Sequence, residues 1–314
     1  MCKASIIVPA YNAEKFIEST INSILSQDFS DFEIIVINDG STDSTEEKVK
    51  AIGLLDERVK YVAQPNSGGP AKPRNVGISH AKGEFIFIFD ADDLMLEGKI
   101  SRSIECLERF PNADLLFTNF STIDESGHVL KENFLHEYDT LWNLTDGRSV
   151  DYCYLPADKV NPALIKVNFV GTSGVVLRKN SLQISDRFDE ALKNSDDRLF
   201  WMLFSLKHNF VFLNEVLHQY RILPGSISNQ GFVRRGPSKI QALKTVMGRV
   251  NSLALKKELS LQISRDYATL AYGYQQKGDN KNQRENALLS LKYEFNLKAI
   301  KLLILSLLKG INKK

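Results

Sequence analysis

Three aspartates, Asp90, Asp92 and Asp93, follow the apolar run FIFIF within four positions of the chain. Carboxylates this close repel one another and are costly to bury. A single Asp-x-Asp after a strand is more often a turn or a helix cap than a ligand site, so its chemistry depends on its neighbours. Asp93 is predicted either to support the neighbouring ligand-binding groups from behind or to cap a helix that begins near Glu97, and the cap is favoured.

Polar residues also follow three other apolar runs, in the stretches PAYN (9–12), NDGSTD (38–43) and QPNSGGPAKPRN (64–75). The carboxyl ends of parallel strands meet at one edge of an open sheet, where ligands bind. These successive strand ends therefore predict one shared ligand site. A second acidic pair, Asp196 and Asp197, opens a helical stretch, where helix capping is the simple alternative.

The strands that would deliver these residues alternate with helices. Buried-strand patterns cover residues 4–9, 32–38, 59–64 and 84–90. Helical patterns cover 13–27 and 74–83, and a further helix, capped by Ser41 or Thr42, is expected after the second strand. The strand at 84–90 is apolar on both faces, as in a parallel strand covered by helices on both sides. Strict alternation predicts a doubly wound α/β sheet.

The pattern loosens after about Asp114. Further strands are expected at 114–120, at 173–179 and, as a strand or a hairpin, at 210–222, with a helix at 198–207 and a turn at 223–228. Residues 124–162 are irregular, which is typical of segments that shape a pocket for a partner substrate. Only helical periodicity remains from Ser238 onward. We expect a domain at 1–235, with halves at about 1–120 and 121–235, and a helical region at 236–314.

Composition narrows the class of protein. With 43% hydrophobic and 25% charged residues, the chain has an ordinary globular composition. Three widely spaced cysteines indicate neither a disulfide framework nor a zinc site, which favours a reducing cytosol. We expect no signal peptide, because the N-terminus is apolar for only a few residues before a proline. We expect no transmembrane span, because no uncharged apolar run reaches about 18 residues.

Opposite charges divide the chain. Residues 238–314 carry 15 Lys/Arg against 5 Asp/Glu, a net of +10, whereas the first 237 residues carry 25 against 33, a net of −8. Near the end, Lys298, Lys301, Lys309 and Lys313 cluster on one helical arc among Leu and Ile residues. Either this helix packs on the rest of the protein, or it anchors the protein at the anionic inner leaflet of a membrane.

The chain resembles glycosyltransferase family 2, the inverting nucleotide-sugar transferases with a GT-A fold. The likeness covers about residues 1–230. It is carried by VPAYN (8–12), NDGSTDST (38–45), NSGGPAKPRNVG (66–77), GEFIFIFDADD (83–93), SDDRLFW (195–201) and YRILPGSIS (220–228). The long, proline-containing loop at 66–77 is similar to that of members that act on bacterial surface polysaccharides and wall polymers.

The resemblance implies roles for these residues. Tyr11 offers a flat face on which a uracil-type base can stack, and Asp39 accepts a hydrogen bond from the base. Asp90 is assigned to the ribose, and Arg74 to phosphate or sugar oxygens as a fork-shaped donor. The implied nucleotide-sugar site in full is Pro9, Tyr11, Asn12, Asp39, Asn66, Gly68, Arg74, Asp90, Ala91 and Arg221.

The resemblance also implies a metal ion and a base. Asp92 would bind Mn²⁺ or Mg²⁺, which neutralises charge on the leaving diphosphate. Inversion requires a base for the acceptor hydroxyl, and either Asp196 or Asp197 is implied. Arg221 is a candidate to close over the diphosphate. Two positions depart from the family pattern, because Asn38 stands where many relatives have a second Asp and Leu223 where relatives often have His.

The leading hypothesis is a metal-dependent, non-processive hexosyltransferase that moves one sugar from a UDP-sugar to a glycan or lipid-linked acceptor in cell-surface polysaccharide synthesis. A nucleotidyltransferase of similar fold would have a Gly-rich basic loop after the first strand. A nucleotide-sugar-binding module without turnover would lack the acidic pair, and a processive synthase would carry Q-x-x-R-W and membrane spans. No nucleic-acid partner is expected, because the basic tail lacks interleaved aromatics. The expected location is the cytoplasm, with peripheral contact at the inner face of the membrane.

Overall fold

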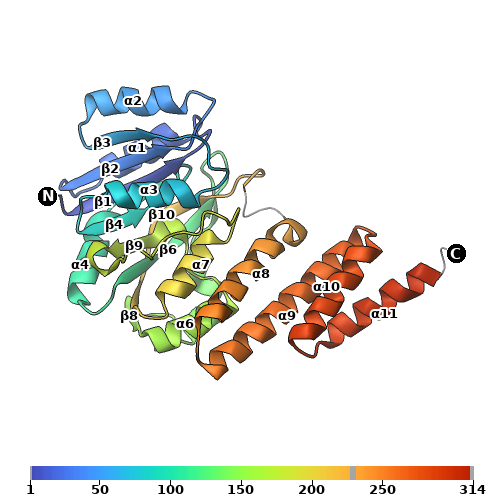
Figure 1. Ribbon diagram of the computed structural model, residues 1–314. Coiled ribbons are helices and arrows are strands. Elements are labelled where there is room, and N and C mark those ends of the chain that lie inside the picture. Colours follow the sequence, from blue (N-terminus) through green and yellow to red (C-terminus); the bar gives the residue numbers. More distant parts are fainter. Residues whose placement is uncertain (1, 227–230, 312–314) are drawn as a thin grey trace. The chain divides into compact units, whose positions relative to one another are not determined.

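The computed structural model describes residues 2–226 and 231–311, without the side chains of 308–311. The chain forms two compact units, Met1–Leu223 and Pro224–Lys314. The first is an α/β unit around one sheet and the second is helical, so the predicted fold class is confirmed (Figure 1). The boundary expected near Arg235 falls within α8 (Phe232–Arg249). Positions 227 and 228 of the predicted turn, and Lys313 of the basic arc, lie outside the described residues.

The sheet follows the order β3-β2-β1-β4-β9-β6-β10-β5, with β7 paired to β6 and β8 paired to β10. The strands are β1 Ala4–Ala10, β2 Phe32–Asn38, β3 Val59–Ala63, β4 Phe85–Ile88, β5 Leu94–Met95, β6 Leu115–Ile123, β7 Val129–Lys131, β8 Tyr152–Leu155, β9 Val175–Arg178 and β10 Phe210–Arg221. Strands β1 to β4 are parallel, and β9 lies antiparallel between β4 and β6. The segment predicted as a strand or hairpin is the single strand β10.

Helices connect the strands of the first unit. They are α1 Ile17–Leu25, α2 Thr45–Leu55, α3 Ala71–His80, α4 Lys99–Arg109, α5 Asp139–Trp142, α6 Ala157–Lys166 and α7 Asp196–Phe204, with 3-10 turns η1 Phe134–Glu137, η2 Thr172–Gly174 and η3 Lys179–Ser181. The segment 124–162, which showed little periodicity, therefore contains a series of short elements. Short elements carry too few residues to show a period.

Alternation along β1 determines which helix covers each face of the sheet. Ile6 and Val8 are fully buried in one core with Ile17 of α1. The intervening Ile7 points to the other face, where its Cγ2 would lie 2.2 Å from a Cβ atom at Gly77 of α3. Gly77 therefore lets α3 approach the sheet more closely than any side chain would allow. Because both faces are covered, β1 is apolar along most of its length.

The start of α2 differs from the prediction. The helix begins at Thr45 after Ser44, so neither Ser41 nor Thr42 is its cap. Instead, Asp43 Oδ1 accepts hydrogen bonds from the Thr45 N–H at 3.0 Å and from Thr45 Oγ1 at 2.6 Å. The predicted cap was wrong because several Ser, Thr and Asp residues follow one another here, and each is an acceptable cap by type.

The second unit contains helices and no strand among its described residues, as expected from Ser238 onward. Its helices are α8, α9 Leu253–Gln276, α10 Asn280–Tyr293 and α11 Leu297–Ile311. Ser252 caps α9 and Asp279 caps α10, each accepting a backbone N–H. No helix within the described residues is long and apolar enough to span a membrane.

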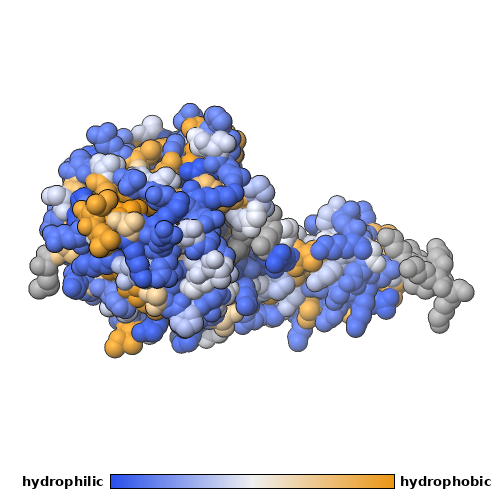
Figure 2. All heavy atoms as spheres, turned by 90° about the horizontal axis from the view of Figure 1, so that it is seen from above, coloured by the Kyte–Doolittle hydropathy of each residue, from blue (hydrophilic) through white to orange (hydrophobic). Residues whose placement is uncertain are grey.

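The face of the molecule that Figure 2 shows is largely hydrophilic, with scattered apolar patches.

Candidate functional site

Neighbouring strand ends bring the first motif residues to one edge of the sheet. The Asp39 N–H donates to the Ala10 carbonyl at 2.8 Å, and the Phe89 N–H donates to the Ile7 carbonyl at 2.9 Å. The turns after β1, β2 and β4 therefore begin beside one another. Tyr11, directly after β1, is 54% exposed and offers its ring to a flat ligand.

Asn12 joins the turn after β1 to the turn after β2. Its φ of 48° lies in the left-handed region, which Asn tolerates better than most residues. Its N–H donates to Ser41 Oγ at 2.9 Å, and its Oδ1 accepts from the Thr42 N–H at 2.9 Å. The two residues predicted to cap α2 therefore hold the candidate site together instead.

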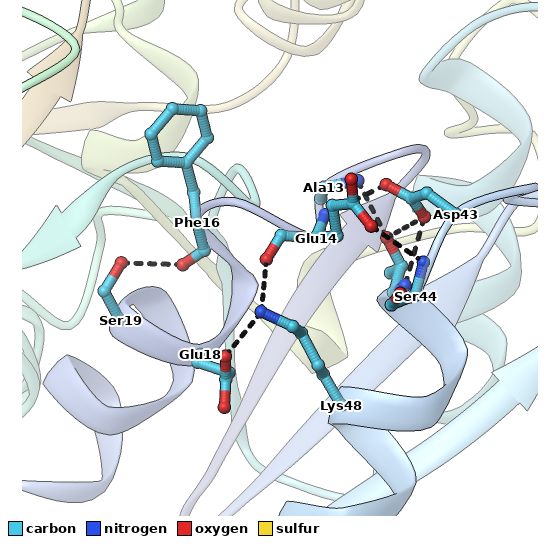
Figure 3. Close-up of polar contacts among 9 residues, drawn as sticks. Ala13, Glu14, Phe16, Glu18, Ser19, Asp43, Ser44 and Lys48 are labelled. Carbon is cyan, nitrogen blue, oxygen red and sulfur yellow. Dashed lines mark hydrogen bonds and ion pairs between the residues drawn. The ribbon is translucent and has the colours of Figure 1, made fainter.

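A second set of contacts ties the same two loops together (Figure 3). The Glu14 N–H donates to Asp43 Oδ2 at 3.1 Å, and Glu14 Oε2 accepts from the Ser44 N–H at 3.0 Å. Lys48 Nζ donates to the Glu14 carbonyl at 2.9 Å and to the Glu18 carboxylate at 2.7 Å. The loop after β1 is thus fixed by contacts within the protein.

Asp39 is 3% exposed, and its carboxylate has several partners. Its Oδ1 accepts from Gln64 Nε2 at 2.5 Å, and its Oδ2 accepts from Ser67 Oγ at 2.8 Å. Gln64 Oε1 is buried and has no partner among the described residues. Gln64 was missed by the sequence reasoning, and its one signal was its position directly after β3. A ligand with an N–H group would satisfy this acceptor.

The other predicted nucleotide-sugar residues lie around the same strand ends. Pro9 belongs to β1, and Ala91 follows β4 with 8% exposure. Asn66 Nδ2 donates to the Asp39 carbonyl at 2.9 Å. Gly68 has a φ of 78°, which few residues other than glycine adopt. The backbone conformation at position 68 is therefore by itself a sufficient reason for glycine.

Arg74 joins two motifs that are far apart in the sequence. It is 5% exposed, and its guanidinium donates to Asp90 Oδ1 at 2.9 Å and to Asp196 Oδ2 at 2.8 Å. The guanidinium also lies 5.4 Å from the ring centre of Phe188. Burial by itself would lower the pKa of Arg74, but Asp90 and Asp196 outweigh it and raise that pKa. The arginine is therefore a permanent charge between two acidic groups.

Asp92 lies half-buried beside Asp90. Burial, and then the charge of Asp90, raise the pKa of Asp92 to about 6. Among the residues that the structure describes, no group of three or more His, Cys, Asp or Glu side chains is placed to hold a metal ion. An ion bound at Asp92 would therefore need oxygen ligands from a substrate or from water.

Asp93 was predicted as a helix cap, and that prediction was wrong. The α4 helix begins at Lys99 after Gly98, whereas Asp93 is fully buried. Asp93 Oδ2 accepts from Ser173 Oγ at 2.5 Å, and its Oδ1 accepts from the Arg221 N–H at 2.9 Å. Asp93 therefore fastens the turn after β4 to η2 and to the end of β10.

A buried basic cluster lies within electrostatic range of Asp93. Lys99 is fully buried, and its Nζ donates to Thr118 Oγ1 at 3.3 Å. His218 Nδ1 lies 3.4 Å from the same oxygen. Burial lowers the pKa of Lys99 to about 7 against the opposing charge of Asp93, and burial also lowers the pKa of His218. No local pattern indicates this cluster, because its members belong to three separate elements.

The two aspartates that open α7 have different surroundings. Asp196 is 2% exposed, and burial raises its pKa to about 6, with Arg74 opposing and Asp197 adding to the rise. Asp197 is only half-buried, and its Oδ2 accepts a long bond from Asn168 Nδ2 at 3.4 Å. Asp197 is therefore the more accessible carboxylate of the pair.

Arg221 is 5% exposed at the end of β10. Its Nε donates to the Asp92 carbonyl at 2.9 Å, and one terminal nitrogen donates to the carbonyls of Asp124 and Glu125, each at 3.0 Å. Its guanidinium lies 4.7 Å from the ring centre of Phe16. In this arrangement Arg221 binds backbone carbonyls next to the acidic turn.

Comparison with known proteins shows the family of the chain. Residues 5–154 match the model of the family described as glycosyl transferase family 2. The chain is 30% identical to the glycosyltransferase GlyG of Streptococcus pneumoniae over 233 residues. This match covers 73% of this chain and 73% of GlyG. The chain belongs to glycosyltransferase family 2. The resemblance inferred from its motifs is confirmed.

Other proteins match more of the chain or share its fold. A GalNAc(5)-diNAcBac-PP-undecaprenol beta-1,3-glucosyltransferase of Campylobacter jejuni is 28% identical over 319 residues, covering 98% of this chain and 94% of its own length. The structure of Staphylococcus aureus TarS 1–349 with UDP-GlcNAc has a TM-score of 0.59 at 18% identity, covering 93% of each chain. Two longer relatives are matched over only 31% and 33% of their lengths.

The family 2 match ends before the acidic pair of α7. Asp196 and Asp197 lie beyond residue 154, where the matched region stops. Arg74, which lies inside the matched region, donates to Asp196. The geometry thus links the part of the chain that matches the family model to a part that it does not cover.

Proposed function

We propose that this family 2 member is an inverting, non-processive hexosyltransferase that moves one sugar from a UDP-sugar to a glycan or lipid-linked acceptor. One observation carries the proposal. Arg74 binds both Asp90 after β4 and Asp196 at the start of α7. The donor-side and acceptor-side carboxylates of the proposed reaction therefore share one centre, as group transfer requires.

The nucleotide would occupy the edge after β1, β2 and β3. The exposed ring of Tyr11 is suited to stacking with a base. A uracil ring carries one N–H between two carbonyls, and Asp39 together with the unpaired Gln64 Oε1 offers acceptors for it. Asp90 would bind the ribose. The TarS structure that shares this fold contains UDP-GlcNAc, which agrees with a UDP-sugar donor.

Asp92 would hold Mn²⁺ or Mg²⁺. The fit rests on its electrostatics, because burial and the charge of Asp90 raise its pKa to about 6, and a nearby cation would reverse that shift. Oxygen ligands are the donors that these hard cations prefer. When bound, the ion would supply Lewis-acid stabilisation of the leaving diphosphate.

The base is Asp197 in this proposal. Asp196 is a poor candidate because Arg74 holds its Oδ2 at 2.8 Å and the pair is buried. Asp197 is half-buried, and among the described residues its carboxylate accepts only the long side-chain hydrogen bond from Asn168. It would accept the proton of the acceptor hydroxyl while that oxygen attacks the anomeric carbon and the diphosphate leaves on the opposite side. Inversion follows from this single displacement.

The acceptor would be a surface glycan or its lipid-linked precursor, bound by residues of the 121–235 half. The Campylobacter relative that spans nearly the whole chain is named for an undecaprenol-linked acceptor. We assign the first unit, Met1–Leu223, to catalysis, and the second unit, Pro224–Lys314, to peripheral contact with an anionic membrane. The proposed location is the cytoplasm at the inner face of the membrane. This compartment keeps thiols reduced, which agrees with the three free cysteines of the chain.

A panel of nucleotide sugars tests this function. The full chain is incubated with UDP-, GDP- and dTDP-sugars and Mn²⁺, and release of the nucleoside diphosphate is measured with and without glycan acceptors. We expect release from a UDP-sugar that rises with an acceptor and is absent in Asp197→Asn. Release from no donor would overturn the proposed turnover, and release from a GDP- or dTDP-sugar alone would overturn the choice of UDP.

A further inference from the structure

The outer face of α11 is apolar and is left uncovered by the described residues of the second unit. Leu297 is 72% exposed, Ile304 is 51% exposed and Leu307 is 46% exposed. Phe295, in the connection that leads into this helix, is 75% exposed. Single apolar residues on a surface are ordinary, but a group of large ones on one element indicates an interaction site.

Helical geometry places these residues together. At about 100° per residue, Leu297, Lys301, Ile304 and Leu307 lie within an arc of roughly 120° on α11. The opposite side of the helix packs inside the second unit, where its core includes residues of α9 and α10. The residues of α11 buried on that side are Ala299, Leu302 and Ser306. The helix thus packs through one stripe and leaves the opposite stripe bare.

Positive charge accompanies this apolar stripe. Leu297–Ile311 contains lysines but no Asp or Glu. Lys298 and Lys301 are both exposed, and Lys298 Nζ lies 5.1 Å from the ring centre of Tyr272 at the edge of the stripe. Neither lysine forms an ion pair with another of the described residues. Their charges are therefore available to an external anionic surface.

We propose that the α11 outer face, defined as Leu297, Lys298, Lys301, Ile304 and Leu307, docks the protein on an anionic lipid surface. Its apolar side chains would enter the boundary between headgroups and acyl chains, and its lysines would meet the anionic headgroups. A second copy is a weaker candidate, because two-fold pairing sets this basic face against itself. The inference deepens the proposed membrane contact and rests on it.

Vesicle flotation of the full chain tests the proposal. Parent protein is mixed at low salt with vesicles of phosphatidylglycerol and phosphatidylcholine, or with phosphatidylcholine alone. We expect binding to the anionic vesicles that is at least tenfold tighter and that weakens as salt rises. Ile304→Glu with Leu307→Glu should lose at least tenfold of that binding, and Lys298→Gln with Lys301→Gln should reduce its salt dependence.

A matched control distinguishes this face from general loss of apolar surface. Leu54 and Leu55 at the end of α2 are 88% and 89% exposed, so Leu54→Glu with Leu55→Glu makes the same change in the other unit and should bind like the parent. Equal loss in both double variants, or no binding of the parent, overturns the proposal. So does an α11 variant that changes a dimer into a monomer, measured by light scattering, without changing vesicle binding.

The same variants separate this inference from the proposed function. Release of UDP in vesicle-free solution should be unchanged in the α11 variants, and circular dichroism should show that they are folded. Vesicle binding without any UDP release would support the docking face and refute the transferase proposal. UDP release without vesicle binding would do the reverse.

Discussion

The nucleotide side and the transfer side of the candidate site share one sheet edge but are built differently. On the nucleotide side, hydrogen bonds such as that from the Asn12 N–H to Ser41 Oγ hold loops together, and the buried Asp39 carboxylate accepts from the neutral donors Gln64 and Ser67. On the transfer side, Arg74, Asp90 and Asp196 form a charged group in which two of the three members are almost fully buried. The first arrangement fixes shape, whereas the second concentrates charge away from water.

This difference has an energetic consequence. A neutral hydrogen bond contributes about 1 kcal/mol and can be lost without disrupting its surroundings. A buried charge that loses its partner costs several kcal/mol, because it remains desolvated. Changes on the transfer side should therefore affect turnover and folding strongly, and changes on the nucleotide side should affect mainly donor affinity.

The largest effect is expected from Asp197→Asn. Removing a general base costs about 10²–10⁴-fold in rate, so acceptor-dependent UDP release should fall by about 10³-fold while UDP affinity stays within about twofold. Asp158→Asn, an exposed acidic residue in the first turn of α6, is the matched control and should be fully active. Normal transfer by Asp197→Asn together with an inactive but folded Asp196→Asn would reverse the assignment.

The next effect should come from Arg74→Gln. Asp196 would lose its buried partner, so the free energy of unfolding should fall by about 3 kcal/mol at pH 7. The loss should be smaller at pH 5, because the pKa of Asp196 is raised to about 6 and its carboxyl is then mostly neutral. Urea denaturation at both pH values measures this, with Lys72→Gln on the same helix as the control. An equal loss at both pH values would show that the ion pair is not the cause.

A smaller effect should appear as a pH dependence of donor binding. The pKa of Asp92 is raised to about 6, so protons should compete with the metal ion below that pH. Mn²⁺-dependent UDP binding should weaken by up to about tenfold per pH unit below 6, as isothermal titration calorimetry can measure. Asp92→Asn should bind UDP weakly and equally across this range. A parent protein with no acid-side loss would remove Asp92 from metal binding.

The smallest effect is expected from Tyr11→Ala on the nucleotide side. Loss of base stacking costs about 1–3 kcal/mol, so the Kd for UDP should rise by about tenfold while kcat at saturating donor stays near that of the parent. Tyr11→Phe keeps the ring face and should behave like the parent. A fall in kcat as large as that of Asp197→Asn would contradict the proposed difference between the nucleotide side and the transfer side.

Local patterns were sufficient for much of this description. The strand ends that carry Tyr11, Asp39 and Asp90 were predicted because buried strands and their polar turns are continuous in the sequence. The helical nature of the second unit was predicted from periodicity for the same reason. What these features share is that each is determined within about ten residues.

Long-range contacts were not predictable in this way. The Arg74–Asp196 pair joins residues 122 positions apart, and no local pattern reports it. Asp93 precedes a helix, which favours a cap, whereas its partners Ser173 and Arg221 are 80 and 128 positions away. A carboxylate has the same sequence signature whether it caps a helix or joins three segments in the interior.

The antiparallel strand β9 has a consequence for biosynthesis. It pairs with both β4 and β6, although it follows them in the chain by many residues. A fragment that ends at residue 154, where the family match stops, would leave both strands with unpaired edges, and such edges recruit other chains into aggregates. During synthesis, one edge of β4, the apolar strand that leads into Asp90 and Asp92, therefore stays unpaired until Val175–Arg178 leaves the ribosome. A nascent chain stalled before that point should depend on chaperones.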